Sequence, residues 1–512
     1  MASTESPLGE EARPSRATLH DATLVGVRWV SLARLVCEVV AFGSMVWLAH
    51  LVPPAEFGRA AVALIVNALA VVVAGGGFAT PLVQRATVQR THFESAQFAT
   101  LAFGAVLTGF TFAIAPVVCD PLFGEETRLL VQLMSPVFVI VSLGVVSQSI
   151  LQRRLDFRRL SLIELASVTS GSLSSLAFAA TGLDGEAIVL GALVAAATLS
   201  LLQQASTPLV LPRWHGTALR EIVSFGLPSA LSSLVMVVNR NIDYAILAAK
   251  LSPAQVGYYW RAFQFGVEHQ RKVSGILMRI ALPIYARAAS AEHQREIRTR
   301  IVRAQTSVVF PLLATFIAVA PALIPWLLGE RWEPAVVPAQ ILAVAGMAAS
   351  VGTGLGPLML AAGRPRELLA YNLASATAFG VTVFVVAPLG LRAVSAAAAA
   401  FYALQLLAAH WLLLDRLLGI PVRQVVADVA PAGIASAGLL AVALPLARSL
   451  DTAGLPLLVQ LAATGTAGGA AYLLLLRLFF RSAWSDLALM AGRVLSRTGG
   501  RKSRSAASTA AG

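Results

Sequence analysis

Apolar runs of 20 or more residues recur along the chain from Leu24 to Phe480, and they constrain the fold more than any other feature. Each run is long enough to cross about 30 Å of hydrocarbon as a helix. A transmembrane β-barrel would instead show alternating segments of roughly ten residues, whereas stretches such as AAVALIVNALAVVVAGGG are apolar on every face. The sequence therefore predicts an all-α, polytopic membrane protein.

Composition supports the same class of protein. With 57% hydrophobic and 13% charged residues, the chain has too little polar surface to cover its apolar side chains in water. Its two cysteines, Cys37 and Cys119, lie far apart in separate apolar runs, which indicates neither a disulfide framework nor a metal cluster. The sequence contains no GxxxxGK[ST] motif, so coupling to ATP hydrolysis within this chain is not supported. We expect no cofactor and no metal site.

The apolar runs number about fourteen, and we expect as many transmembrane helices. The seventh and eighth runs cover 224–249 and 257–280. The loops are no longer than about 20 residues, which leaves no room for a soluble catalytic domain. We therefore expect no enzymatic activity, and a membrane-embedded polysaccharide enzyme or scaffold is the least favoured alternative.

Basic residues are concentrated in alternate loops, with about 24 Lys or Arg on one side and about 6 on the other. The positive-inside rule then places both termini and loops such as 152–162 in the cytoplasm. This asymmetry accounts for the net charge of +13 without a nucleic-acid partner.

The chain also repeats itself. LAHLVPPAEFG at 48–58 matches LAAKLSPAQVG at 247–257, about 200 residues later. This spacing predicts two six-helix repeats of the same orientation, forming two lobes with the ligand path between them. The expected parts are a cytoplasmic tail (1–23), an N-lobe of helices 1–6 (24–215), a C-lobe of helices 7–12 (216–420), an extra C-terminal helix pair (421–480) and a basic, disordered cytoplasmic tail (481–512).

Charge inside the apolar runs is concentrated in the first, seventh and eighth. A charge near the middle of the bilayer costs on the order of 2.5–3.5 kcal/mol, so these groups should face a wet cavity or one another. The candidate substrate-binding residues are Arg34, Asn239, Arg240, Asn241, Arg261, Gln264, Arg271 and Lys272, and the candidate ion-coupling or charge-pairing residues are Glu38, Asp243 and Glu268.

Helical spacing groups these candidates. Arg34 and Glu38 are one turn apart and can pair, as can Asn239 and Asp243, while the eighth run carries one polar stripe. Arg261 could equally extend its guanidinium to lipid headgroups. The three runs hold seven Lys or Arg against three Asp or Glu, a surplus that suits an anionic ligand rather than a cationic one. We predict that Arg34 and Arg240 converge on an anionic group of the ligand near the middle of the cleft.

Three stretches stand out in order and spacing: FGLPSALSSLVMVVNRNIDYAILAAKLSPAQVGYYWRAF, LQRRLDFRRLSLIELAS and LPIYARAAS. They resemble the polysaccharide-transporter (Wzx-type oligosaccharide flippase) family of the multidrug/oligosaccharidyl-lipid/polysaccharide (MOP) exporter superfamily. The resemblance covers roughly residues 20–420.

The resemblance implies a flippase of the bacterial cytoplasmic (inner) membrane. Its two lobes would alternate between inward and outward openings and move an undecaprenyl-diphosphate-linked oligosaccharide outward for cell-surface polysaccharide biosynthesis. The implied partners are the lipid-linked substrate, membrane lipids, H⁺ or Na⁺ as the coupling ion, and a polysaccharide polymerase or glycosyltransferase. A lipid II flippase and a multidrug or metabolite cation antiporter of the same superfamily are the alternatives.

Overall fold

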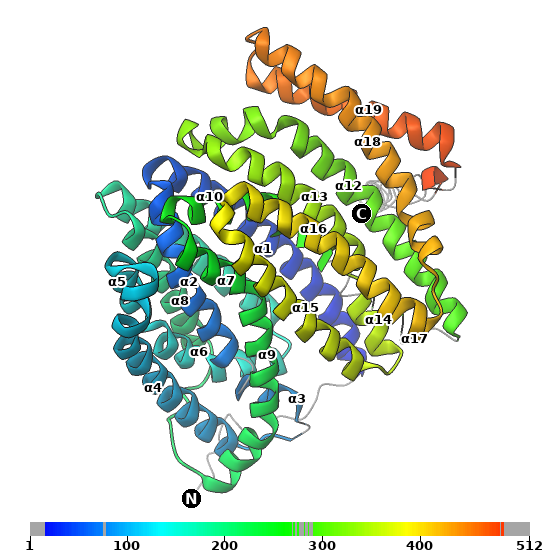
Figure 1. Cartoon of the computed structure of the whole chain (residues 1–512). Helices are drawn as coiled ribbons and strands as arrows, with labels where there is room; N and C mark the ends of the chain where they lie inside the picture. The colour runs from blue at the N-terminus through cyan, green and yellow to red at the C-terminus, as the bar shows by residue number, and fades with distance from the viewer. Residues whose placement is uncertain are drawn as a thin grey trace, which may run out of the picture. The chain divides into compact units, whose positions relative to one another are not determined.

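The computed structural model of the chain describes residues 16–74, 78–85, 87–268, 270–271, 274–275, 281, 285, 290–481 and 483–485. These residues form helices joined by short turns, with no strand among them (Figure 1). Twelve of the helices in this part of the chain are long and apolar enough to cross a membrane. The predicted all-α membrane class is thereby confirmed.

Twelve of the predicted runs coincide with these helices, and the runs at 224–249 and 257–280 do not. The first of the two lies in α9 (Gly216–Lys250), which is long but carries four consecutive or near-consecutive polar residues from Asn239 to Asp243. The second begins in α10 (Pro253–Phe263) and η2 (Gln264–Glu268) and continues beyond the described residues. The predicted total of fourteen therefore stays a prediction.

The chain divides into two compact units, 1–260 and 261–512. In the first unit α1 packs on α7, α7 packs on α8, and α9 packs on α2 and α4. Its other helices, besides α9 and the start of α10, are α1 (Arg16–Leu51), α2 (Pro54–Ala74), α3 (Thr80–Gln84), α4 (Arg90–Phe123), α5 (Glu125–Met134), α6 (Val137–Arg153), α7 (Phe157–Ala180) and α8 (Gly185–Ala205). The predicted lobe boundary at 215 stays a prediction, because the compactness of one state does not show which helices move together.

In the second unit α13 packs on α12 and α16, while α18 and α19 pack against each other and against α12 (Figure 1). Its elements after η2 are α12 (Ala291–Leu328), η3 (Glu330–Ala335), α13 (Val336–Gly352), α14 (Leu355–Ala361), α15 (Pro365–Val386), η4 (Ala387–Leu389), α16 (Leu391–Ala409), η5 (His410–Asp415), α17 (Arg416–Leu418), α18 (Val422–Thr452) and α19 (Leu457–Phe479). The predicted extra helix pair thus corresponds to α18 and α19.

The internal repeat extends to buried hydrogen bonds. In the first unit Gln97 Nε2 donates to the Ser142 carbonyl oxygen at 3.4 Å. In the second unit Gln305 Nε2 donates to the Ser350 carbonyl oxygen at 2.7 Å. Both pairs have the same offset in sequence and all four residues are buried. Each half therefore joins its third and fourth helices through an equivalent polar contact.

A glycine turn follows the third helix in both halves. Gly124 ends α4 with φ of 85°, and Gly329 ends α12 with φ of 96°. Glycine adopts this region without the Cβ clash that other residues suffer. The same device therefore stops the third helix and starts the fourth in each repeat.

Candidate functional site

The repeated motif places two glycines in reciprocal contact inside the first unit. A Cβ atom added at Gly58 would lie 1.9 Å from the Pro253 carbonyl oxygen, and one added at Gly257 would lie 2.0 Å from the Pro54 carbonyl oxygen. Only a residue without a side chain lets two helices approach this closely. The first turns of α2 and α10 therefore cross backbone against backbone, through matching positions of the two repeats.

Asp243 is almost fully buried, at 2% exposure, on α9. Its Oδ2 accepts a hydrogen bond from the Tyr259 hydroxyl at 3.2 Å, and the Tyr259 ring lies edge-on to Tyr244. Asp243 and Tyr259 lie equally far on either side of Leu251, so the hairpin between α9 and α10 brings them together. Our sequence reasoning missed Tyr259, and this equal spacing was the signal that could have identified it.

The neighbouring candidates on α9 have different surroundings. Arg240 is exposed. Asn241 is partly buried, and its Nδ2 donates to the Val237 carbonyl oxygen at 2.8 Å. The Asn239 side chain lies outside the described residues. Arg240 is therefore an exposed cation within the polar segment of α9 from Asn239 to Asp243.

Arg34 is also exposed, on α1, while Glu38 is partly buried one turn later. The residues beside Arg34 on this surface are apolar, with Leu35 62% and Val39 65% exposed. In the described part of the chain Arg34 forms no ion pair with a carboxylate. Its charge is therefore available to an outside anion rather than held in a structural pair.

Arg34 and Arg240 lie at different distances from the C-terminal ends of their helices, α1 and α9. Arg34 is about 17 residues before the end of α1, and Arg240 is about 10 residues before the end of α9. At a rise of about 1.5 Å per residue, these positions differ by about 10 Å along their helices. Two long arginine side chains can span such an offset, so the predicted convergence on one diphosphate stays a prediction.

In the second unit, the predicted polar stripe begins with Arg261, which is 4% exposed. Its Nη1 donates to Gln264 Oε1 at 2.6 Å, and its guanidinium carbon lies 6.0 Å from the centroid of the Trp332 ring. Trp332 is completely buried. Arg261 is therefore packed inside its unit and does not extend to lipid headgroups.

The stripe continues with Glu268 and Arg271. Arg271 Nη1 donates to Glu268 Oε1 at 2.6 Å, and its Nη2 donates to the Tyr402 hydroxyl at 2.9 Å. The Arg271 guanidinium also lies over the Phe263 ring at 5.3 Å. These partners fix both charged side chains within the unit. Lys272 lies outside the described residues.

A buried ionic cluster joins α12 to α18, and our sequence reasoning missed it. Asp428, with 1% of its side chain exposed, accepts hydrogen bonds from Arg298 at 3.2 Å, from Thr299 at 3.1 Å and from Arg303 at 3.2 Å. The Arg298 side chain is only 5% exposed. The sequence signal that could have identified this cluster is Asp428 itself, an acidic residue near the start of the apolar run at 425–447.

A second polar cluster joins α3, α4 and α9 near the start of α9. Glu221 accepts hydrogen bonds from His92 Nε2 at 3.2 Å and from Arg85 Nη2 at 2.6 Å. These contacts, first the His92 hydrogen bond and then that of Arg85, hold the pKa of the Glu221 carboxyl below its usual value. Across the described ranges, no group of three or more His, Cys, Asp or Glu side chains could hold a metal ion.

Comparison with known proteins identifies relatives over most of the chain. A family model described as polysaccharide biosynthesis protein matches residues 47–337. The lipopolysaccharide biosynthesis protein WzxC of Escherichia coli (strain K12) is 23% identical over 360 residues, covering 70% of this chain and 73% of WzxC. The teichuronic acid biosynthesis protein TuaB of Bacillus subtilis (strain 168) is 24% identical over 401 residues, covering 76% of this chain and 81% of TuaB.

A solved structure shares the fold. The lipid II flippase MurJ, in an inward closed conformation, matches with a TM-score of 0.73 at 12% sequence identity. The match covers 88% of this chain and 98% of MurJ. The fold is therefore that of an all-helical membrane transporter.

Proposed function

Because this chain belongs to the polysaccharide biosynthesis protein family, we propose that it flips a lipid-linked oligosaccharide across the membrane by alternating access. The family and the MurJ-like fold point to a transporter rather than an enzyme. The relatives named for lipopolysaccharide and teichuronic acid biosynthesis support a substrate destined for cell-surface polysaccharide.

The observation that carries the proposal is the exposure of Arg34 and Arg240 on α1 and α9, two helices that we expect to cross the membrane. A cation in such a helix costs on the order of 2.5–3.5 kcal/mol on insertion scales, so it is retained for a function. The guanidinium stays charged and donates two parallel hydrogen bonds to phosphate oxygens. This chemistry fits the diphosphate of an undecaprenyl-diphosphate carrier.

The different depths of Arg34 and Arg240 suggest an order of contact. Arg34, which is farther from the outer turn, would meet the diphosphate first on the cytoplasmic side, and Arg240 would take it over deeper in the membrane. The predicted convergence of both arginines on one diphosphate would then be one stage of this transfer. Asn239, Asn241, Arg261, Gln264, Arg271 and Lys272 stay predicted substrate contacts, and in the present structure Arg261 and Arg271 are held by partners within the second unit.

For ion coupling we propose Asp243 as the principal residue, with Glu38 and Glu268 as further candidates. Asp243 is buried, and its carboxylate accepts a hydrogen bond from the Tyr259 hydroxyl. Protonation or ion binding at Asp243 would therefore change the contact that joins α9 to α10. Glu268 is instead held by Arg271. The coupling ion in this proposal is H⁺ or Na⁺.

The proposal predicts that reconstituted protein moves undecaprenyl-diphosphate-linked N-acetylglucosamine between leaflets of a liposome. Arg34→Ala and Arg240→Ala should each slow this movement at least about tenfold, because each loses a charge-assisted contact. The flipping rates of the Arg→Lys variants should lie between those of the alanine variants and wild type. Lysine keeps the charge but cannot donate two parallel hydrogen bonds to one phosphate. Asp243→Asn should remove the response to an imposed ion gradient.

Arg392→Ala is the matched control, since Arg392 is an exposed arginine elsewhere in the chain. It should flip the lipid at the wild-type rate. Equal handling of the diphosphate-linked and monophosphate-linked lipids, unchanged by both alanine variants, would contradict the proposal. Gradient-driven uptake of a fluorescent cation would favour the antiporter alternative, and preference for lipid II over other diphosphate lipids would favour that flippase.

We further propose that the protein lies in the bacterial cytoplasmic membrane with both termini inside. An Arg158→Cys variant should react with a membrane-impermeant maleimide only after the cells are opened, whereas Asp184→Cys should react in intact cells. The native Cys37 and Cys119 are buried, so they should add little background. Labelling of Arg158→Cys from outside would overturn this orientation.

A further inference from the structure

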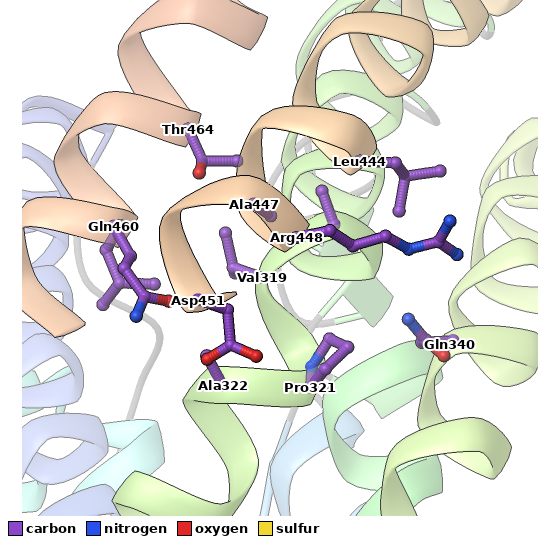
Figure 2. Close-up of a pocket in the computed structure, with 12 residues that line it drawn as sticks. Val319, Pro321, Ala322, Gln340, Leu444, Ala447, Arg448, Asp451, Gln460 and Thr464 are labelled. Carbon is purple, nitrogen blue, oxygen red and sulfur yellow. The ribbon is translucent and has the colours of Figure 1, made fainter. Parts of the chain in front are cut away.

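The second unit contains a cavity of about 180 Å³ that the proposed transport path does not use (Figure 2). Its walls come from the second halves of α12 and α18, the first half of α13 and the first half of α19. Val319 and Leu444 contribute apolar wall, while five polar side chains line the rest: Gln340, Arg448, Asp451, Gln460 and Thr464.

Three of these polar groups have hydrogen-bonding capacity that the protein does not use. Thr464 is 1% exposed, its hydroxyl has no hydrogen-bond partner in the described structure, and Figure 2 shows that oxygen turned toward the cavity. Gln340 and Gln460 each donate through Nε2 to a backbone carbonyl oxygen, at 2.8 and 2.9 Å. Their Oε1 atoms remain as acceptors. A buried hydroxyl without a partner is unusual in a native protein and indicates a ligand or water at the site.

The charges of the cavity balance. Arg448 and Asp451 supply one positive and one negative charge from the same helix, and both are exposed. Within the described residues they form no ion pair with each other, and in Figure 2 Arg448 extends toward the side of Gln340 while Asp451 lies nearer Gln460. A diphosphate or an anionic lipid would favour a positive surplus. A site with separated charges of both signs fits a zwitterion.

The position of the cavity favours a lipid headgroup. Asp451 lies in the last turn of α18, which ends at Thr452, and α19 begins at Leu457. Helix ends of a transmembrane pair lie in the interfacial region, where headgroups are found. Leu458 and Val459 at the start of α19 are 70% and 47% exposed, so acyl chains have apolar surface beside the cavity.

We propose that this cavity binds the headgroup of a zwitterionic aminophospholipid of the phosphatidylethanolamine class. Arg448 contacts the phosphate, while Asp451 and the Gln460 Oε1 atom accept hydrogen bonds from the primary ammonium. Thr464 supplies a further hydrogen bond from the inner wall. The lipid is a resident partner of the α18–α19 pair and not the transported substrate.

Native mass spectrometry of delipidated full-length protein tests this with three lipids of identical acyl chains. Phosphatidylethanolamine should bind at least about fivefold more tightly than phosphatidylcholine, whose quaternary ammonium has no N–H donor, and than anionic phosphatidylglycerol. Arg448→Gln should weaken binding of phosphatidylethanolamine about tenfold. Thr464→Val, which keeps the side-chain shape, should weaken it about threefold.

Asp451→Asn provides the sharpest test, because it leaves the cavity with a positive surplus. Its preference should move from phosphatidylethanolamine to phosphatidylglycerol, a change that general loss of folding cannot produce. Arg392→Gln, a surface arginine outside the cavity, should leave all three affinities unchanged. Equal affinity for the three lipids, or an unchanged preference in Asp451→Asn, would overturn the proposal. Displacement of phosphatidylethanolamine by undecaprenyl diphosphate would also overturn it, because the cavity would then belong to the substrate path.

Discussion

Asp428→Asn should destabilise the protein by about 3 to 5 kcal/mol, which is the range observed when one partner of a buried ion pair is removed. The carboxylate accepts hydrogen bonds from Arg298, Thr299 and Arg303, and amide oxygen alone cannot balance the Arg298 charge in a site that is 5% exposed. The thermal midpoint in detergent should fall by on the order of 10 °C. Fluorescence-detected size-exclusion chromatography after heating measures this directly.

Glu292→Gln is the matched control, because Glu292 is an exposed acid on α12, the helix that carries Arg298. Its thermal midpoint should stay at the wild-type value. The double variant Asp428→Leu with Arg298→Met should recover a large part of the lost stability, since an apolar pair of similar volume needs no counter-charge. A midpoint for Asp428→Asn close to that of Glu292→Gln would show that the cluster does not stabilise the joint between α12 and α18.

The membrane fold could be predicted because its signal is local. An uninterrupted run such as 96–119 is apolar on all sides, and only a helix satisfies its backbone groups in lipid. The structure places this run in α4, between Arg90 and Phe123. The same reasoning located twelve spans. It does not show whether the run at 257–280 crosses the membrane. This run carries the polar stripe and continues beyond the described residues, so the total number of spans stays a prediction.

Two partners of the charged candidates, Tyr259 and Tyr402, could not be predicted, because they lie on other helices than the candidates they contact. Helical spacing pointed to partners of Asp243 on its own helix, and the structure adds the Tyr259 hydroxyl across the hairpin. Arg271 likewise finds Tyr402 on α16. An i to i+4 pattern reports only neighbours on one helix. Which polar side chains face a partner and which face a ligand depends on how the helices pack.

The depth difference between Arg34 and Arg240 illustrates a further limit. The sequence shows both cations in matching helices, which suggested one shared phosphate site. The duplicated turn that ends at Gly58 and Gly257 supplies the common reference, and from it the two positions differ by about 10 Å along their helices. The spacing of each arginine from its repeated glycine is already present in the sequence. The structure adds that both intervening segments are continuous helix up to Leu51 and Lys250, so the spacing converts into a distance.

Gly58→Ala and Gly257→Ala should each lower the flipping rate at least about fivefold, and by similar factors. The added Cβ would lie 1.9 Å from the Pro253 carbonyl oxygen in one variant and 2.0 Å from the Pro54 carbonyl oxygen in the other. Backbone atoms cannot turn aside as a flexible side chain can, so the first turns of α2 and α10 must separate. Overpacking of this kind typically costs about 1 to 3 kcal/mol, which corresponds to about 5- to 150-fold in the population of the state that contains the contact.

The size of the effect should follow the contact and not the loss of glycine. Gly109→Ala on α4 is the control, because a Cβ there meets no atom within 4 Å, and it should flip lipid at the wild-type rate. Transport requires each of the alternating states in turn, so a variant that excludes this contact should insert into the membrane and bind substrate yet complete the cycle slowly. Liposome flipping and substrate binding, measured on the same preparations, separate these steps. Wild-type flipping by Gly58→Ala together with Gly257→Ala would show that the crossing of the duplicated turns does not belong to a state that the transport cycle needs.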